Sequence, residues 1–244
     1  MCRSCRRFPN TFFYISETVV TQMLESGVST PLKGIKKIAA RRMVESWSAP
    51  AFSLSIDIDM SSVLATAKSL PGVTVTDLIL KASSNALIAC PELNAHFIDD
   101  TITTFSEVNI GLAVATPAGL TVPVIHNIHN LALDAVAASR KEIVERARTG
   151  KLVMADISGA TFTISNLGML GIDRFVALLN PPGVAILAVG SAIKKPIVVD
   201  DVVEIRPIAS LTLTCDHRAV DGAAGALFLS NLRQTLLNSE TLKE

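Results

Sequence analysis

Residues 211–226 read "LTLTCDHRAVDGAAGA", and this stretch joins an apolar strand pattern to a histidine flanked by two aspartates. Leu211, Leu213 and Cys215 share one parity while threonines occupy the other, which is typical of a strand with one buried face. If the strand continues, His217 falls on the apolar side, at the edge of the buried layer. A histidine titrates near neutral pH and therefore suits acid–base chemistry there.

The residues around His217 also allow a purely structural interpretation. A lone histidine at a strand end is more often structural than catalytic, so the stretch by itself leaves both roles open. Asp221 precedes the small-residue run "GAAGALFL" and is placed as the N-cap of a terminal helix. Asp216 and Arg218 are placed either to fix the turn around His217 or to form a solvated ion pair.

Composition excludes several classes of function. The 244 residues are 49% hydrophobic and 18% charged, enough for one large domain or two small ones. The 22 Lys and Arg balance the 22 Asp and Glu, and aromatic residues are few, so we expect no nucleic-acid partner. No apolar run approaches the roughly 18–20 residues that cross a bilayer, so we expect no membrane partner. The high apolar fraction favours an oligomer.

The four cysteines do not form a metal-binding or redox pattern. Cys2 and Cys5 form a lone CxxC with no second pair and no histidine cluster, which favours an incidental pair. Cys90 and Cys215 lie in apolar patterns and are predicted to be core thiols. We therefore expect no metal site.

Helices and strands are mixed without strict βαβ alternation. This favours an α+β sandwich with a mixed sheet over a doubly wound fold. Periodicity predicts helices over 30–46, 74–90 (with Thr76 as cap), 130–151 and 222–237, and strands over 51–60, 108–125 (two strands around "TPAG"), 159–165, 183–193 and 209–215. Gly150 suits the position after the third helix.

The chain is interpreted as a leader over residues 1–30 followed by one domain over residues 31–244. The first 16 residues hold three arginines and no acid, a weak resemblance to a mitochondrial presequence, although a poorly packed leader fits them better. In the following helix Lys33, Lys37 and Arg41 are spaced i, i+4, i+8 and share a face. That face is either solvated or binds an anion.

"CDHRAVDG" resembles the DHRxxDG signature of the dihydrolipoamide acyltransferases, the E2 components of 2-oxo acid dehydrogenase complexes; chloramphenicol acetyltransferase has the related HHxxxDG. Further stretches match that family in its order over roughly residues 31–237: "KIAARRMVES", "VTVTDLILKASSNAL", "PELNA", "VNIGLAVATPAGLTVPVI", "TFTISNLGMLGI" and "LLNPPGVAILAVG". The resemblance implies a trimeric, chloramphenicol acetyltransferase-like α+β sandwich with a mixed β-sheet and flanking helices.

The resemblance also implies a mechanism. His217 matches the catalytic base that takes the proton of the coenzyme A thiol, which is mostly protonated at neutral pH. The thiolate then attacks an acyl-dihydrolipoamide thioester, and Ser165 matches the hydroxyl that stabilises the oxyanion. Asp221 matches the closing acid of the signature and is expected to orient His217. Because coenzyme A carries phosphates, Lys37, Arg41 and Arg42 are the candidate cofactor-binding residues.

Members of the family are trimers in which His217 and Ser165 of one site would come from neighbouring subunits, and the trimers usually form a larger cage. The polar end "NSETLKE" counts against the cage here. The implied partners are a lipoyl-bearing domain and the E1 and E3 components. Residues 1–30 are too few for a lipoyl domain, so the lipoyl group is expected on a domain absent from this chain.

The favoured reaction is acetyl transfer in a pyruvate or acetoin dehydrogenase complex. Two alternatives stay open: a catalytically inactive structural core subunit, and a free-standing coenzyme A-dependent acetyltransferase. The expected compartment is the bacterial cytoplasm, with the mitochondrial matrix as the alternative. No phosphate-binding glycine motif is present, which fits an extended coenzyme A channel.

Overall fold

The computed structural model describes residues 27–243. The fold below is that of the compact unit Gly34–Glu244. The predicted leader over residues 1–30 and the pair Cys2–Cys5 lie almost wholly outside the described residues, so the two-part division stays a prediction. Across the residues described, no helix is both long and apolar enough to cross a membrane.

A seven-stranded mixed sheet forms the centre of the fold. Its order is β1-β11-β9-β8-β4-β7, with β10 paired to β11. β8 runs parallel to β4 and β9, and the other pairs are antiparallel, as the mixed-sheet prediction requires. The strands are β1 (Ala51–Asp59), β4 (Ile110–Leu112), β7 (Val124–Ile125), β8 (Phe162–Asn166), β9 (Ala185–Val189), β10 (Ile193–Val199) and β11 (Val202–Asp216).

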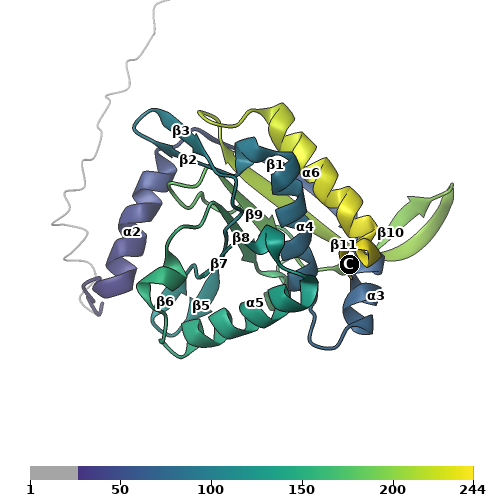
Figure 1. Ribbon diagram of the computed structural model, residues 1–244, viewed down its shortest axis with the longest axis horizontal. Helices are drawn as coiled ribbons and strands as arrows, with labels where there is room; N and C mark the ends of the chain where they lie inside the picture. The colour runs from purple at the N-terminus through teal and green to yellow at the C-terminus, as the bar shows by residue number, and fades with distance from the viewer. Residues whose placement is uncertain (1–26, 244) are drawn as a thin grey trace, which may run out of the picture. The chain divides into compact units, whose positions relative to one another are not determined.

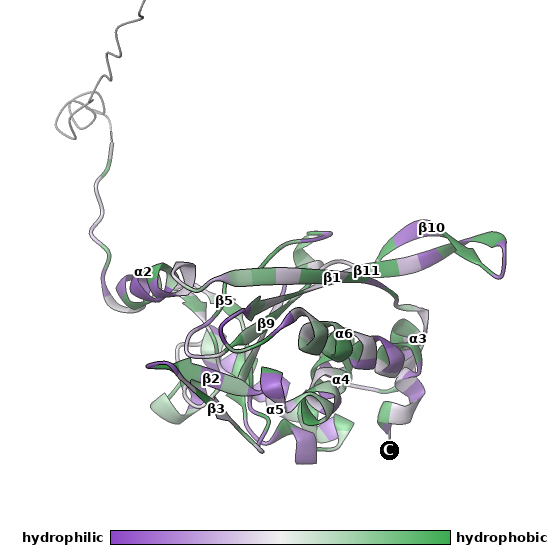
Figure 2. Cartoon of the chain, turned by 90° about the horizontal axis from the view of Figure 1, so that it is seen from above, coloured by the Kyte–Doolittle hydropathy of each residue, from purple (hydrophilic) through white to green (hydrophobic). Residues whose placement is uncertain are grey.

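Four helices pack on one face of this sheet, and α2 lies at its edge (Figures 1 and 2). The helices are α2 (Gly34–Trp47), α3 (Ser61–Ser69), α4 (Val75–Ala89), α5 (Leu133–Arg148) and α6 (Gly222–Leu237). Two small hairpins flank the sheet, β2 (Ala95–Ile98) with β3 (Thr101–Thr104) and β5 (Val114–Thr116) with β6 (Gly119–Thr121). Short 3-10 turns complete the fold: η1 (Pro91–Leu93), η2 (Ile128–Asn130), η3 (Met154–Ile157), η4 (Gly168–Leu170) and η5 (Ser239–Lys243).

The two faces of β1 and β11 differ as their alternation predicts. Toward the helices, a Cβ built on Gly225 of α6 would lie 2.9 Å from Leu54 Cδ1, so the helix approaches the sheet closely. On the other face hydroxyls pair across the strands, Ser53 with Thr214 at 3.1 Å and Ser55 with Thr212 at 2.9 Å. The exposed serines thereby satisfy the buried hydroxyls of Thr212 and Thr214.

Cys90 and Cys215 are buried free thiols, which confirms that they are core residues. Burial raises the pKa of Cys215 to about 12, because the thiolate would lose its hydration, with the nearby Asp216 carboxylate adding to the effect. The Cys215 thiol is therefore neutral and unreactive at physiological pH.

Three sequence predictions need correction. Helix α4 is capped by Thr74 instead of Thr76, because the Asp77 carboxylate accepts hydrogen bonds from Thr74 N at 2.8 Å and Thr74 Oγ1 at 2.7 Å. The two strands predicted over 108–125 are four shorter ones. The strands predicted over 183–193 and 209–215 miss the β10–β11 ribbon, whose turn places Asp200 and Asp201 at φ 48° and 63°. This ribbon projects beyond the rest of the sheet (Figure 2).

The loop that follows β8 packs against the sheet at Gly190, the residue immediately after β9. A Cβ on Gly190 would lie 2.0 Å from the carbonyl oxygen of Asp173 and 3.1 Å from that of Ser210. Ser191 also holds this loop, since its N–H donates to Ile172 O at 2.8 Å and its Oγ to Gly168 O at 2.8 Å. Only glycine at position 190 therefore allows the loop to pack this closely against the sheet.

We predict that Gly190→Ala lowers the free energy of unfolding by about 1–3 kcal/mol, the usual cost of overpacking against backbone. Urea unfolding measures the loss. The control is Gly222→Ala in the first turn of α6, where a Cβ would have no neighbour within 4 Å and no loss is expected. Equal stability of the two variants would contradict the close approach at Gly190.

Candidate active site

His217 stands immediately after β11, where the strand gives way to a turn. Its N–H donates to Pro50 O at 3.0 Å, which ties the turn to the start of β1. Its ring packs against Phe52, with centroids 4.6 Å apart and a 48° tilt. The predicted side is right, because Phe52 belongs to the apolar face. The expectation that His217 lies at the edge of the buried layer instead of in solvent is wrong for the single chain. The strand ends at Asp216, and His217 is exposed.

Asp216 and Arg218 fix the turn that carries His217. Asp216 is 4% exposed, and its Oδ1 accepts hydrogen bonds from Arg218 N at 3.0 Å and Arg218 Nε at 2.9 Å. Its Oδ2 accepts from Arg218 Nη2 at 2.6 Å. These bonds hold the pKa of Arg218 above its ordinary value. The predicted brace is therefore present, as a charge-assisted pair rather than a loose solvated one.

Asp221 is the N-cap of α6, as predicted. Its Oδ1 accepts a hydrogen bond from Ala224 N at 2.8 Å. Within residues 27–243 no hydrogen bond joins Asp221 to the His217 ring. The carboxylate thus stabilises the start of α6, the helix that follows the His217 turn.

Ser165 lies in β8, far from His217 of the same chain. In the sheet Ser165 is opposite Ala188 of β9, and Ala188 is opposite Thr212 of β11. Five residues of strand, roughly 16 Å, separate Thr212 from His217, and two strand spacings add roughly 10 Å across the sheet. Ser165 and His217 are therefore roughly 19 Å apart, and one chain does not bring them together.

The surroundings of Ser165 are rigid and open. Asn166 donates to Thr76 Oγ1 at 3.2 Å and accepts from Gly168 N at 2.9 Å, which fixes the turn after β8. A Cβ on Gly168 would lie 2.8 Å from Gly190 O, so the turn needs glycine. Ser165 is half-buried, and its Oγ bonds to none of the described residues, so the hydroxyl is available to a substrate.

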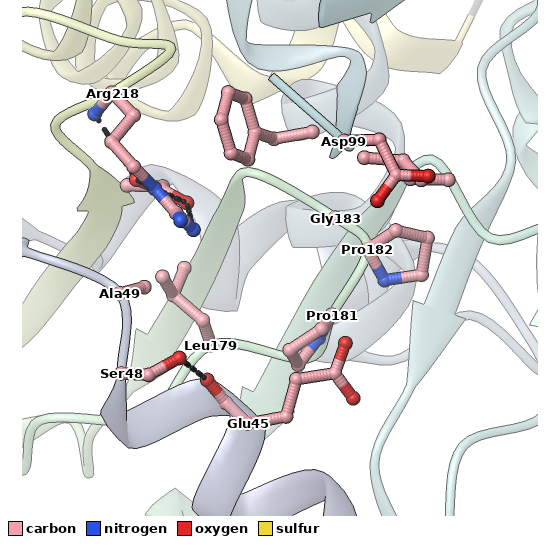
Figure 3. A pocket seen from close by; sticks show the side chains of 12 residues that line it. Glu45, Ser48, Ala49, Asp99, Leu179, Pro181, Pro182, Gly183 and Arg218 are labelled. Atoms are coloured by element: carbon pink, nitrogen blue, oxygen red, sulfur yellow. Dashed lines mark hydrogen bonds and ion pairs between the residues drawn. The ribbon is translucent and has the colours of Figure 1, made fainter. Parts of the chain in front are cut away.

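A cleft of about 420 Å³ opens beside the His217 turn (Figure 3). The end of α2, the β2–β3 turn and the segment 179–183 form its walls, and Asp216 and Arg218 line it. The chain runs from this end of α2 through Pro50 into β1, next to His217. The cleft and the candidate base are thus neighbours.

Lys37, Arg41 and Arg42 all lie on α2 and are exposed. None of them forms an ion pair with a residue of the described part of the chain, so all three charges are available to an anion. The structure brings the end of their helix to the cleft, but no contact joins the three side chains to His217 or Ser165. No cluster of potential metal ligands occurs in residues 27–243.

Two residues near His217 were not found from the sequence. Phe52 carried a signal, because it is the first apolar residue of an alternating strand that pairs with the strand of His217. Phe97 carried no such signal in the sequence. Its ring centroid lies 4.2 Å from the Arg218 guanidinium carbon. It belongs to a hairpin outside the main sheet, and local pattern does not place such a hairpin.

Comparisons with known proteins identify the family of this chain. Residues 25–243 match the family model of the 2-oxoacid dehydrogenases acyltransferase (catalytic domain). The chain belongs to this acyltransferase family. It is 39% identical over 220 residues to the dihydrolipoyllysine-residue acetyltransferase component of the pyruvate dehydrogenase complex of Schizosaccharomyces pombe, a mitochondrial protein. The match covers 85% of this chain and 45% of that protein.

Solved acyltransferase structures share the fold. The dihydrolipoamide acetyltransferase of Azotobacter vinelandii matches with a TM-score of 0.84 and 33% identity, over 88% of this chain and 93% of that one. The cubic core of a pyruvate dehydrogenase multienzyme complex matches with a TM-score of 0.82 and 33% identity, over 88% and 93%. Chloramphenicol acetyltransferase, at 14% identity, 80% and 94% coverage and a TM-score of 0.56, shares the fold alone. The predicted fold class is confirmed.

The cap role of Asp221 gives a prediction for this acyltransferase domain. Asp221→Asn should keep the free energy of unfolding within a few tenths of a kcal/mol, because asparagine caps helices about as well as aspartate. Asp221→Ala should lower it by about 1 kcal/mol. Urea unfolding distinguishes the two. A comparable loss in both variants would mean that the negative charge, not the hydrogen bond to Ala224 N, stabilises the helix.

Proposed function

We propose that this chain transfers an acetyl group between a dihydrolipoyl thiol and coenzyme A, as the E2 core of a pyruvate or acetoin dehydrogenase complex. The observation that carries the proposal is the braced His217 turn, in a chain whose family and relatives are acyltransferases. The Azotobacter vinelandii relative was solved in a study of one serine, one histidine and one asparagine in its catalytic mechanism. Ser165, His217 and Asp221 are our candidates for the corresponding roles.

His217 acts as the base and then as the acid. It accepts the proton of the coenzyme A thiol, and the resulting thiolate forms a bond to the thioester carbonyl carbon. The carbonyl oxygen becomes an oxyanion, to which Ser165 donates a hydrogen bond. When the intermediate collapses, the bond to the dihydrolipoyl sulfur breaks, and the imidazolium returns its proton to that sulfur. No covalent enzyme intermediate is needed, so the chain contributes mainly by positioning the two thiols and the thioester.

The proposed site lies between two subunits of a homotrimer. The separation of roughly 19 Å within one chain prevents Ser165 and His217 from serving the same carbonyl group, whereas two adjacent chains can supply one residue each. The cubic core of the relative shows that members of the family assemble further. We propose the trimer as the catalytic unit, with a lipoyl-bearing domain and the E1 and E3 components as partners.

Mixed trimers test the shared site. His217→Ala and Ser165→Ala should each abolish most of the transfer from acetyl-CoA to dihydrolipoamide, the serine change by about 10²–10³-fold. When the two variants are unfolded together at equal amounts and refolded, about one quarter of the sites in a cyclic trimer combine both intact residues. Activity should recover to about one quarter of wild type.

The control is each variant refolded alone, which should stay inactive. Absence of recovery in mixtures shown by mass measurement to be trimers would contradict a site shared between subunits. Wild-type trimers that transfer no acetyl group would favour the first alternative, an inactive structural core subunit. Transfer to a hydroxyl or amine acceptor instead of dihydrolipoamide would favour the second, a free-standing acetyltransferase.

We propose that Lys37, Arg41 and Arg42 bind the phosphates of coenzyme A. Their support is that all three charges are exposed and unpaired within the described part of the chain, on the helix that ends at the cleft. Lys37 and Arg41 are one helical turn apart and lie on the same face, which suits an extended polyphosphate.

We predict that Arg41→Glu and Arg42→Glu each raise the KM for coenzyme A by about fivefold at low salt, as expected for an exposed ion pair. The KM for dihydrolipoamide should not change, because that substrate carries no phosphate. Lys141→Glu, on the exposed face of α5, is the control. Equal effects on both substrates, or none at low salt, would contradict the phosphate site.

The relatives indicate the cellular compartment of this protein only in part. The Schizosaccharomyces pombe relative is mitochondrial, and bacteria hold other members of the family. We retain the bacterial cytoplasm as the proposal and the mitochondrial matrix as the alternative, to be decided by imaging the tagged protein in its own cell.

A further inference from the structure

The Arg218 side chain is held on two sides at once. Asp216 binds it in the plane of the guanidinium group, through Nε and Nη2. Phe97 covers its face, with the ring centroid 4.2 Å from Arg218 Cζ. A planar, delocalised cation suits both contacts, because its edge pairs with the carboxylate while its face lies on the ring.

Phe97 reaches Arg218 from a hairpin that is fastened to the same strand ends. Phe97 N donates to Pro182 O at 3.0 Å, and Val184 N donates to Ala95 O at 3.2 Å. Val184 O in turn accepts a hydrogen bond from Asp216 N at 2.9 Å. The β2–β3 hairpin, the segment before β9 and the end of β11 therefore form one backbone network, and Phe97 is its side-chain link to the His217 turn.

We infer that Phe97 is a positioning residue for His217, acting through the stacked Arg218 guanidinium. Arg218 and His217 are adjacent in a turn whose backbone bonds run from Ala219 N and Val220 N to Asp216 O, each at 3.0 Å. A guanidinium group that rotates away from Asp216 loosens this turn and the imidazole with it. The inference rests on the proposed acetyl transfer by His217.

The test is a kinetic comparison of matched phenylalanine variants in the full chain. Phe97→Leu should lower kcat for acetyl transfer two- to fivefold, the value of an exposed cation–π contact, and leave both KM values unchanged. Phe97→Trp, which keeps a ring face, should restore kcat. The control is Phe105→Leu, a half-buried ring just after the same hairpin that packs on His96 at 4.6 Å and should leave kcat unchanged.

A double-mutant cycle separates positioning from general support of the fold. In an Arg218→Gln background, Phe97→Leu should cause no further loss of kcat, because the cation is already absent. Equal kcat losses in Phe97→Leu and Phe105→Leu, or an undiminished loss in the Arg218→Gln background, would overturn the inference. A raised KM with unchanged kcat would also overturn it, since Phe97 lines the cleft and would then be a substrate contact.

Histidine NMR supplies a readout that does not depend on the reaction. The chain has four histidines, so the His217 imidazole signals are assigned by their loss in His217→Ala. Phe97→Leu should shift these signals, and Phe105→Leu should not. If the wild type transfers no acetyl group, the proposed function fails while this measurement still decides the inference. If Phe97→Leu does not fold, Phe97→Met, whose flexible side chain adapts to an irregular gap but carries no ring, takes its place.

Discussion

The pairing of β11 with β1 and β9 is the constraint on which the rest of the structure depends. β1 and β11 run side by side from Ala51 opposite Asp216 to Asp59 opposite Ile208. A slip of one residue would turn the hydroxyl pairs toward the helices and the leucines toward the other face, so the alternation fixes the register. That register puts Pro50 within hydrogen-bond reach of His217, and the pairing of β11 with β9 and of β9 with β8 places Ser165 level with Thr212.

A buried charge at the end of β11 is tolerated because it is fully paired. A lone carboxylate as buried as Asp216 would destabilise the fold by several kcal/mol. Arg218 compensates this with both its guanidinium group and its backbone N–H, and the result is a turn with few alternative conformations. Asp77, buried at 0% exposure, is stabilised in the same way by Arg140 of α5, which holds two helices together. The first pair supports the site and the second only the fold.

Local pattern predicted the elements whose partners are close in sequence or strongly periodic. The alternation of β1 and the cap of α6 at Asp221 were found because each depends on a few neighbouring residues. The exposure of His217 was not, because parity holds only while the strand lasts. The β10–β11 ribbon was missed because its valines stand in adjacent pairs, Val198–Val199 and Val202–Val203, so no alternation of apolar and polar residues marks these strands. Phe97 was missed because its contact with Arg218 spans more than 100 residues of chain.

The exposure of His217 and the isolation of Ser165 have a common physical consequence. A thioester in open water is subject to hydrolysis, so acyl transfer needs a site from which water is excluded. A single chain provides no such site at His217, whose ring faces solvent beyond its contact with Phe52. The same chain exposes large apolar side chains on the loop after β8 and on the ribbon, among them Met169, Leu170 and Ile205. We propose that trimer assembly covers such surfaces, and that the same assembly brings the serine to the histidine and excludes water from the bond that is made.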